Sequence, residues 1–98
     1  MRISSPNSGI TLTEEQARVL LTAHLNKLDT RTGPALLKMS RSRLAHVAER
    51  LERLDLLLTH AIQISPRELR YVVTAAGEGW LDECWRSIPK KSEESSEP

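Results

Sequence analysis

The sequence predicts a small, mainly α domain that carries one β-hairpin, an α+β fold. Helical apolar spacing fills the first half of the chain, a segment rich in branched residues follows it, and a second helical pattern precedes a polar tail. A chain of 98 residues has room for one domain. We expect a flexible N-terminus over 1–10, a folded domain over 11–88 and a disordered polar tail over 89–98.

The start of the first helix is predicted from capping residues. Thr11 is followed by Glu14, and Thr13 by Gln16, and both pairs have the spacing of a capping box. Apolar residues then recur every three or four positions as far as Leu28. The sequence therefore predicts a helix that begins at one of the two threonines and ends near Leu28.

Two further helices are predicted after a polar break at 29–33. Pro34 suits the first turn of a short second helix that continues to about Met39. The third helix extends over 41–54 and has one polar side. Its apolar residues share about a third of the helical circumference; they are Leu44, Val47, Ala48, Leu51 and Leu54.

A hairpin and a last helix complete the prediction. Branched and alternating residues over 57–64 favour a strand, and the segment 65–68 is a plausible turn. The second strand, over 69–73, must be antiparallel to the first because so short a connection permits only a hairpin. Thr74 is the expected N-cap of a helix over 75–88.

Charge is unevenly distributed along the chain. The net charge is only +1, yet the segment 31–70 holds eight bases and four acids, a surplus of four positive charges. The rest of the chain holds six bases and nine acids. The middle of the chain is therefore the place to expect an anionic partner.

Three segments of this basic region carry a resemblance to a known family. Ser40–Leu44 opens the third helix, Leu51–Leu54 closes it, and Arg70–Gly77 leads from the hairpin to the last helix. In this order and at these intervals, they resemble winged helix-turn-helix regulators of the MarR and PadR types over roughly residues 13–86. The resemblance implies a winged helix-turn-helix fold whose third helix lies in the major groove of double-stranded DNA.

Carried over to this sequence, the resemblance implies a set of DNA contacts. Residues at the start of the third helix would approach the bases and those near its end the backbone, because arginine offers a fork of donors to guanine or phosphate. The alternative is a solvated helix face whose arginines pair with Glu49 and Glu52. The predicted DNA contacts are Arg41, Ser42, Arg43, His46, Arg50, Arg53, Arg67 and Arg70.

The sequence also departs from the family pattern. The second helix is short, and Asp55 stands where these proteins usually have glycine, although aspartate tolerates a left-handed backbone. The long extra helices by which MarR-type proteins dimerise are missing from these 98 residues. An adaptor that binds a protein partner through the same basic face therefore stays open as an alternative.

The last helix predicts a homodimer. Its apolar residues follow helical spacing, and two tryptophans in a chain without phenylalanine form a stripe that a small core is not expected to cover. We expect this stripe to pack against the same stripe of a second copy of the chain. The predicted interface consists of Trp80, Leu81, Cys84, Trp85 and Ile88.

Other function classes are disfavoured by the residues. The three histidines are scattered and Cys84 is the only cysteine, so we expect neither metal, cofactor nor disulfide. The longest apolar runs hold three residues, and no apolar segment follows the first basic residue, so we expect neither a membrane span nor a secretory signal. Together with these exclusions, the resemblance implies a cytoplasmic, nucleoid-associated, non-enzymatic repressor that binds specific DNA sequences.

Overall fold

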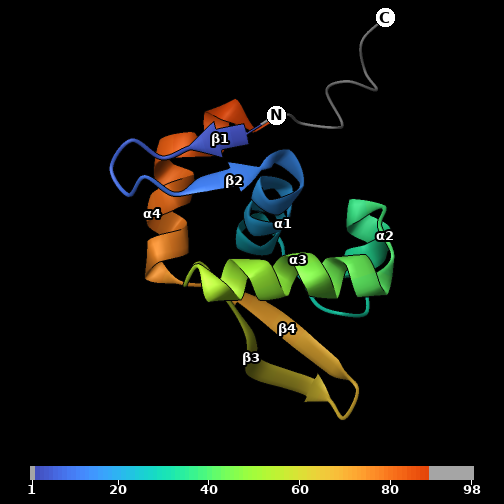
Figure 1. Cartoon of the computed structure of the whole chain (residues 1–98). Helices are drawn as coiled ribbons and strands as arrows, with labels where there is room; N and C mark the ends of the chain where they lie inside the picture. Colours follow the sequence, from blue (N-terminus) through green and yellow to red (C-terminus); the bar gives the residue numbers. More distant parts are fainter. Residues whose placement is uncertain (1, 89–98) are drawn as a thin grey trace, which may run out of the picture.

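The computed structural model describes residues 2–88, and its helices and strands follow the predicted order after an additional N-terminal hairpin (Figure 1). Four α-helices combine with two antiparallel two-stranded sheets within these residues, which confirms the predicted α+β winged-helix class. The tail predicted over 89–98 lies outside the described residues. The elements are β1 (Arg2–Ser4), β2 (Thr11–Thr13), α1 (Glu14–Leu25), α2 (Gly33–Leu37), α3 (Arg41–Arg53), β3 (Leu57–Ser65), β4 (Glu68–Val73), α4 (Ala75–Cys84) and a 3-10 turn (Trp85–Ser87).

Strands β1 and β2 form a hairpin that includes residues 2–10, which the sequence predicts to be flexible. They pair in antiparallel register, with Ile3 opposite Leu12, and both of these side chains are buried. The first element of the structure therefore begins at Arg2, before residue 11, where the folded domain is expected to start. Each strand has three residues and a single buried side chain, which is too short a pattern for periodicity to reveal.

Helix α1 begins at the second of the two predicted capping sites. Thr13 Oγ1 accepts a hydrogen bond from the Gln16 amide at 3.2 Å, and Gln16 Oε1 accepts one from the Thr13 amide at 2.9 Å. Thr11 lies in β2 instead. The helix ends at Leu25, before the predicted Leu28, because the backbone becomes extended at Asn26.

The core lies between the helices and the base of the wing. On α3, the predicted stripe is buried from Leu44 to Leu51, whereas Leu54 is 40% exposed. At Gly77 the first turn of α4 approaches the loop between α3 and β3 so closely that a Cβ would lie 2.2 Å from the Leu56 carbonyl oxygen. Asp55 has a φ of 66°, which is the left-handed conformation expected at this position.

The wing, β3 with β4, projects beside α3 and is anchored by the loop that follows α1 (Figure 1). The Thr30 amide donates to the Leu69 carbonyl at 2.9 Å, and the Tyr71 amide donates to the Leu28 carbonyl at 2.9 Å. This short bridge adds a third chain segment beside β4. Consequently, β4 is fixed along its middle to the loop that follows α1. None of the helices within residues 2–88 is long and apolar enough to cross a membrane.

Candidate nucleic-acid interface

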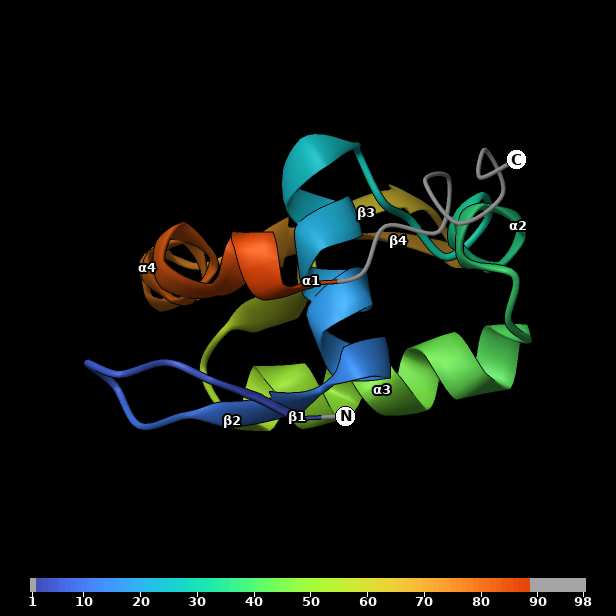
Figure 2. The same ribbon diagram turned by 90° about the horizontal axis from the view of Figure 1, so that it is seen from above.

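Helix α3 has one buried face and one exposed face. The Ser40 hydroxyl accepts a hydrogen bond from the Arg43 amide at 3.1 Å and so fixes where the helix begins. The buried stripe packs against α1, and the opposite face lies open along one side of the molecule together with the β1–β2 hairpin (Figure 2). The predicted contacts Arg41, Ser42, Arg43, His46, Arg50 and Arg53 are all exposed on α3.

Arg43 is held against α1. Its Nε donates to both carboxylate oxygens of Glu15, at 3.0 and 3.1 Å, and its terminal nitrogen also contacts this carboxylate. The hydrogen bonds and the negative charge of Glu15 raise the pKa of Arg43. A guanidinium predicted to read bases is therefore already engaged by a carboxylate, although the Arg43 side chain stays 53% exposed.

Arg41 connects the start of α3 with the tip of the wing. Its terminal nitrogen donates to the Arg67 carbonyl oxygen at 2.8 Å. This bond brings the two basic residues, which are far apart in the sequence, to one end of the α3 face. Both side chains are exposed.

The two acids on α3 behave differently. Glu49 accepts from Arg53 at 3.1 Å, in a pair whose side chains are 63% and 70% exposed. Glu52 instead accepts from the Thr59 amide at 3.1 Å and from the Thr59 hydroxyl at 2.8 Å, and these hydrogen bonds lower the pKa of Glu52. In the alternative interpretation, Glu49 and Glu52 both pair with arginines of α3. Glu52 is instead bound to β3.

Arg70 is less exposed to solvent than the other predicted DNA contacts. It is half-buried in β4 and lies opposite Asp29, and its Nε has no hydrogen-bond partner within residues 2–88. Burial raises the pKa of Asp29, but hydrogen bonds from Thr32 and Arg31, together with the charge of Arg70, outweigh this effect and lower it. Arg70 therefore sits where β4 is anchored to the loop that follows α1.

A groove lies between the N-terminal hairpin and the last turns of α3. Its volume is about 420 Å³, and its lining includes Arg2, Thr11, Thr13, Gln16, Arg50 and Arg53. The sequence reasoning missed Arg2 because the first ten residues were expected to be flexible. The polar–apolar–polar pattern shared by Arg2-Ile3-Ser4 and Thr11-Leu12-Thr13 was the only available sign of the hairpin.

The predicted dimer residues lie mainly in the protein's own core. Trp80, Leu81, Cys84 and Ile88 are 2–3% exposed, and Trp85 alone is 40% exposed. The premise that a small core could not cover the stripe is therefore wrong. The N-terminal hairpin provides part of the cover, because Trp80 Nε1 donates to the Ile10 carbonyl at 3.0 Å.

An apolar groove beside Trp85 is what remains of the predicted interface. It lies between α1 and α4, has a volume of about 400 Å³ and is lined by Leu21, His24, Leu25, Leu81, Asp82 and Trp85. Leu25 is 68% exposed at its rim. Burial and the charge of Glu83 raise the pKa of the Cys84 thiol, so this cysteine is not an activated nucleophile.

Possible metal ligands do not gather in the described part of the chain. Within residues 2–88, no group of three or more histidine, cysteine, aspartate or glutamate residues could hold a metal ion. The candidate site is the basic face of α3, because its exposed arginines favour an anion.

No protein-family model matches the sequence, and no curated protein is similar enough to count as a match. Solved structures do match the fold. The zinc-responsive MarR family member ZitR of Lactococcus lactis has a TM-score of 0.71 at 15% identity, covering 97% of this chain and 65% of that one. A complex of S. aureus MepR with DNA has a TM-score of 0.68 at 18% identity, covering 87% of this chain and 68% of that one.

A third match is the regulator PcaV of Streptomyces coelicolor, solved with its natural ligand, with a TM-score of 0.65 at 22% identity. The match covers 86% of this chain and 67% of PcaV. This chain thus spans about two thirds of the length of these structures. At 15–22% identity, these matches show the fold alone. It is the fold that the MarR-type part of the sequence resemblance implies, and the matches give no support to the PadR-type part. The chain has the winged-helix fold that these MarR-family transcriptional regulators share.

Proposed function

We propose that the chain is a transcription regulator, a repressor, that binds specific sequences of double-stranded DNA. The observation that carries this proposal is the exposed face of α3, where four arginines gather on a fold similar to that of a DNA-bound regulator. An α-helix fits the major groove, and arginine can pair with guanine or phosphate through two parallel hydrogen bonds. The four arginines are Arg41, Arg43, Arg50 and Arg53.

The residues divide into two roles in this proposal. Ser42, Arg43 and His46 approach base edges from the first two turns of α3. Arg41 joins them while its bond to the wing fixes the start of the helix. Arg43 must exchange its bonds to Glu15 for bonds to a base. The remaining contacts, Arg50 and Arg53 on α3 and Arg67 and Arg70 on the wing, serve the phosphate backbone or hold the wing in place.

We also propose that the regulator acts as a homodimer. The groove between α1 and α4 exposes Trp85 and Leu25, and a second copy would bury both. The buried residues Trp80, Leu81, Cys84 and Ile88 would support this surface from beneath. The proposed protein has no enzymatic activity and acts in the cytoplasm at the nucleoid.

A protein-binding adaptor is the second candidate, because the wing exposes apolar side chains. The apolar side chains concerned lie on β3 and are 40–43% exposed; they are Leu58, Ile62 and Ile64. A wing that contacts only DNA phosphates would instead carry polar side chains there. The ion pair between Arg53 and Glu49 also reduces the positive charge of α3. Both features would suit a protein partner.

Selection of bound duplexes from a random pool, followed by titration at several salt concentrations, tests the two candidates. A regulator should enrich one sequence and lose affinity steeply as salt rises, because each neutralised phosphate releases counterions. A chain that binds no duplex even at low salt would contradict the proposal and favour the adaptor.

A further inference from the structure

The groove between the N-terminal hairpin and α3 contains an unusual combination of side chains. Its charged residues are Arg2 from β1 and Arg50 and Arg53 from α3, and no aspartate or glutamate of the described residues lines it. Three like charges around a space of about 420 Å³ repel one another. Such an arrangement favours a bound anion.

The hydrogen-bonding groups of this groove are mainly unused donors. Thr13 Oγ1 and Gln16 Oε1 are already engaged in the cap of α1, and Thr11 Oγ1 lies 2.6 Å from Ser4 Oγ. The polar acceptors are therefore occupied, whereas the guanidinium groups of Arg2 and Arg50 and the Gln16 amide nitrogen remain as donors. Arg53 also pairs with Glu49, at 3.1 Å, and offers its remaining N–H groups. A ligand with several charged oxygens, such as a phosphate group, matches this set.

Two carboxylates that share a hollow with Arg2 are engaged elsewhere. A neighbouring hollow is lined by Arg2, Glu14 and Glu15. Glu14 pairs with Arg18 at 3.3 Å, and Glu15 is bound by Arg43. No hydrogen bond or ion pair of the Arg2 side chain is found within residues 2–88, so its charge is not neutralised there.

The helix dipole explains only part of the cluster. Cations in the last turn of α3 are favourable without any ligand, which would account for Arg50 and Arg53. It does not account for Arg2, which comes from another element. The carbonyl oxygens at the end of a helix repel an anion. Those of Arg50 and Glu52 already accept hydrogen bonds from the Leu54 and Asp55 amides, at 3.3 and 2.9 Å, which weakens this repulsion.

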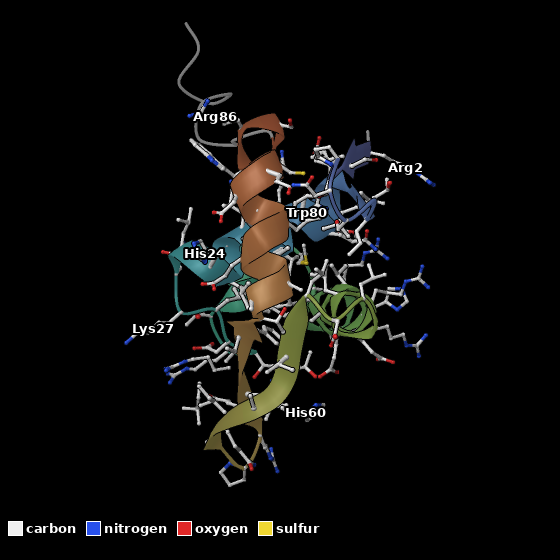
Figure 3. The ribbon with its side chains drawn as sticks, turned by 90° about the vertical axis from the view of Figure 1, so that its left-hand side faces the viewer. Arg2, His24, Lys27, His60, Trp80 and Arg86 are labelled. Carbon is white, nitrogen blue, oxygen red and sulfur yellow. The ribbon has the colours of Figure 1, made fainter. Side chains whose placement is uncertain are left out.

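Arg2 also faces the proposed DNA. Figure 3 shows its side chain extending on the same side as the exposed face of α3, whereas Lys27 and His24 extend on the opposite side. We propose that this groove binds a phosphate group, held jointly by Arg2, Arg50 and Arg53. The identity of that group as a DNA backbone phosphate rests on the proposed function, and the hairpin would then extend the interface beyond the end of α3.

The test uses the whole chain and two substitutions on opposite walls of the groove, Arg2→Gln and Arg50→Gln, with their double variant. Lys27→Gln removes one positive charge from the opposite side and serves as the matched control. Circular dichroism checks that each variant folds. Duplex affinity is measured between low and moderate salt, and separately the arginine Nε–H NMR signals are followed while inorganic phosphate is added.

If the groove holds a backbone phosphate, each single variant should lose about fivefold to tenfold in affinity for every duplex at about 0.1 M salt, and the slope against salt should fall by about one. Lys27→Gln should change both quantities much less. Because both arginines bind the same phosphate, the double variant should lose less than the product of the two single losses. Losses equal to that of Lys27→Gln, or fully independent losses at Arg2 and Arg50, would overturn the inference.

The phosphate titration separates this inference from the proposed function. If no duplex binds but phosphate shifts the signals of Arg2, Arg50 and Arg53 together, the regulator proposal fails and the groove is a site for a free phosphate compound. If neither a duplex nor phosphate affects these signals, the inference fails as well.

Discussion

Arg43 of α3 is bound by Glu15 of α1 through hydrogen bonds from Nε of 3.0 and 3.1 Å. The same guanidinium is the strongest candidate for reading a base, so Glu15 competes with DNA for it. A neighbouring acid, Glu14, pairs instead with Arg18. The chain therefore provides two adjacent carboxylates of which only one engages α3.

Glu15→Gln should strengthen DNA binding, because Arg43 no longer has to leave a carboxylate. The expected gain is about twofold to fivefold, the range for losing one exposed ion pair. Glu14→Gln is the matched control, since it changes the net charge equally without freeing Arg43. Equal gains for the two variants in a duplex titration would show that overall charge, and not release of Arg43, causes the effect.

Substitution of the two ends of α3 should separate base contacts from backbone contacts. Arg43→Ala should relax the base preference at one position at a cost of about tenfold or more, because a lost bidentate pair discriminates strongly between bases. Arg53→Ala should weaken all sequences alike and reduce the salt slope. Losses at both positions that do not depend on sequence would contradict direct readout by Arg43.

The buried stripe of α3 predicts a stability difference between two leucines. Leu51 is fully buried, so Leu51→Ala should lower the free energy of unfolding by about 2 to 5 kcal/mol through the cavity it leaves. Leu54, which is 40% exposed, is the control and should cost much less when changed to alanine. Denaturant unfolding of both variants measures the difference. Similar losses in the free energy of unfolding would mean that α3 turns a different face to the core.

Glu52 should make the fold sensitive to acid. Hydrogen bonds from the Thr59 amide and hydroxyl lower its pKa from the ordinary value of 4.5, so the ionised form is the one that stabilises the folded chain. That contribution is fully present above the unfolded pKa and is lost as the pH falls through the lower folded pKa.

Glu52→Gln should therefore reduce stability near neutral pH and flatten the part of the acid dependence that lies below about pH 4.5. Glu49→Gln, which removes only the exposed pair with Arg53, is the control. Thermal unfolding over a pH series measures both variants. Parallel curves for Glu52→Gln and the unmodified protein would exclude this role of Glu52.

Local sequence patterns predicted the helices and the wing because capping pairs and apolar spacing act within a few residues. Thr13, Ser40 and Thr74 each accept the amide hydrogen bond that begins a helix. Burial of Trp80 depends on a hairpin 70 residues away, through its bond to Ile10, and no local pattern reports such a contact.

The candidate site could be predicted only in part for the same reason. Periodicity placed the arginines on the exposed face of α3, because that face follows directly from the buried stripe. The partner of Arg43 is Glu15, which is 28 positions away in sequence, and Arg2 joins the groove only through the fold of the hairpin. Contacts between distant segments decide which arginines are free.

The exposed Trp85 should decide the oligomeric state. If a second copy covers the groove between α1 and α4, Trp85→Ser should convert a dimer into monomers, because a large exposed aromatic at an interface contributes much of the binding energy. Leu36→Ser, which removes an apolar side chain that is 53% exposed on α2, is the control. Sedimentation of the unmodified protein and both variants measures the effect.

A two-fold dimer also predicts the form of the DNA site. Two α3 helices presented by one dimer should select an inverted repeat whose half-sites are about one duplex turn apart, roughly 34 to 36 Å. Trp85→Ser should then bind single half-sites, and only weakly, while its α3 face is unchanged. If the unmodified protein sediments as a monomer at tens of micromolar, with and without DNA, the dimer and the inverted repeat are both excluded, and one chain must read its site alone.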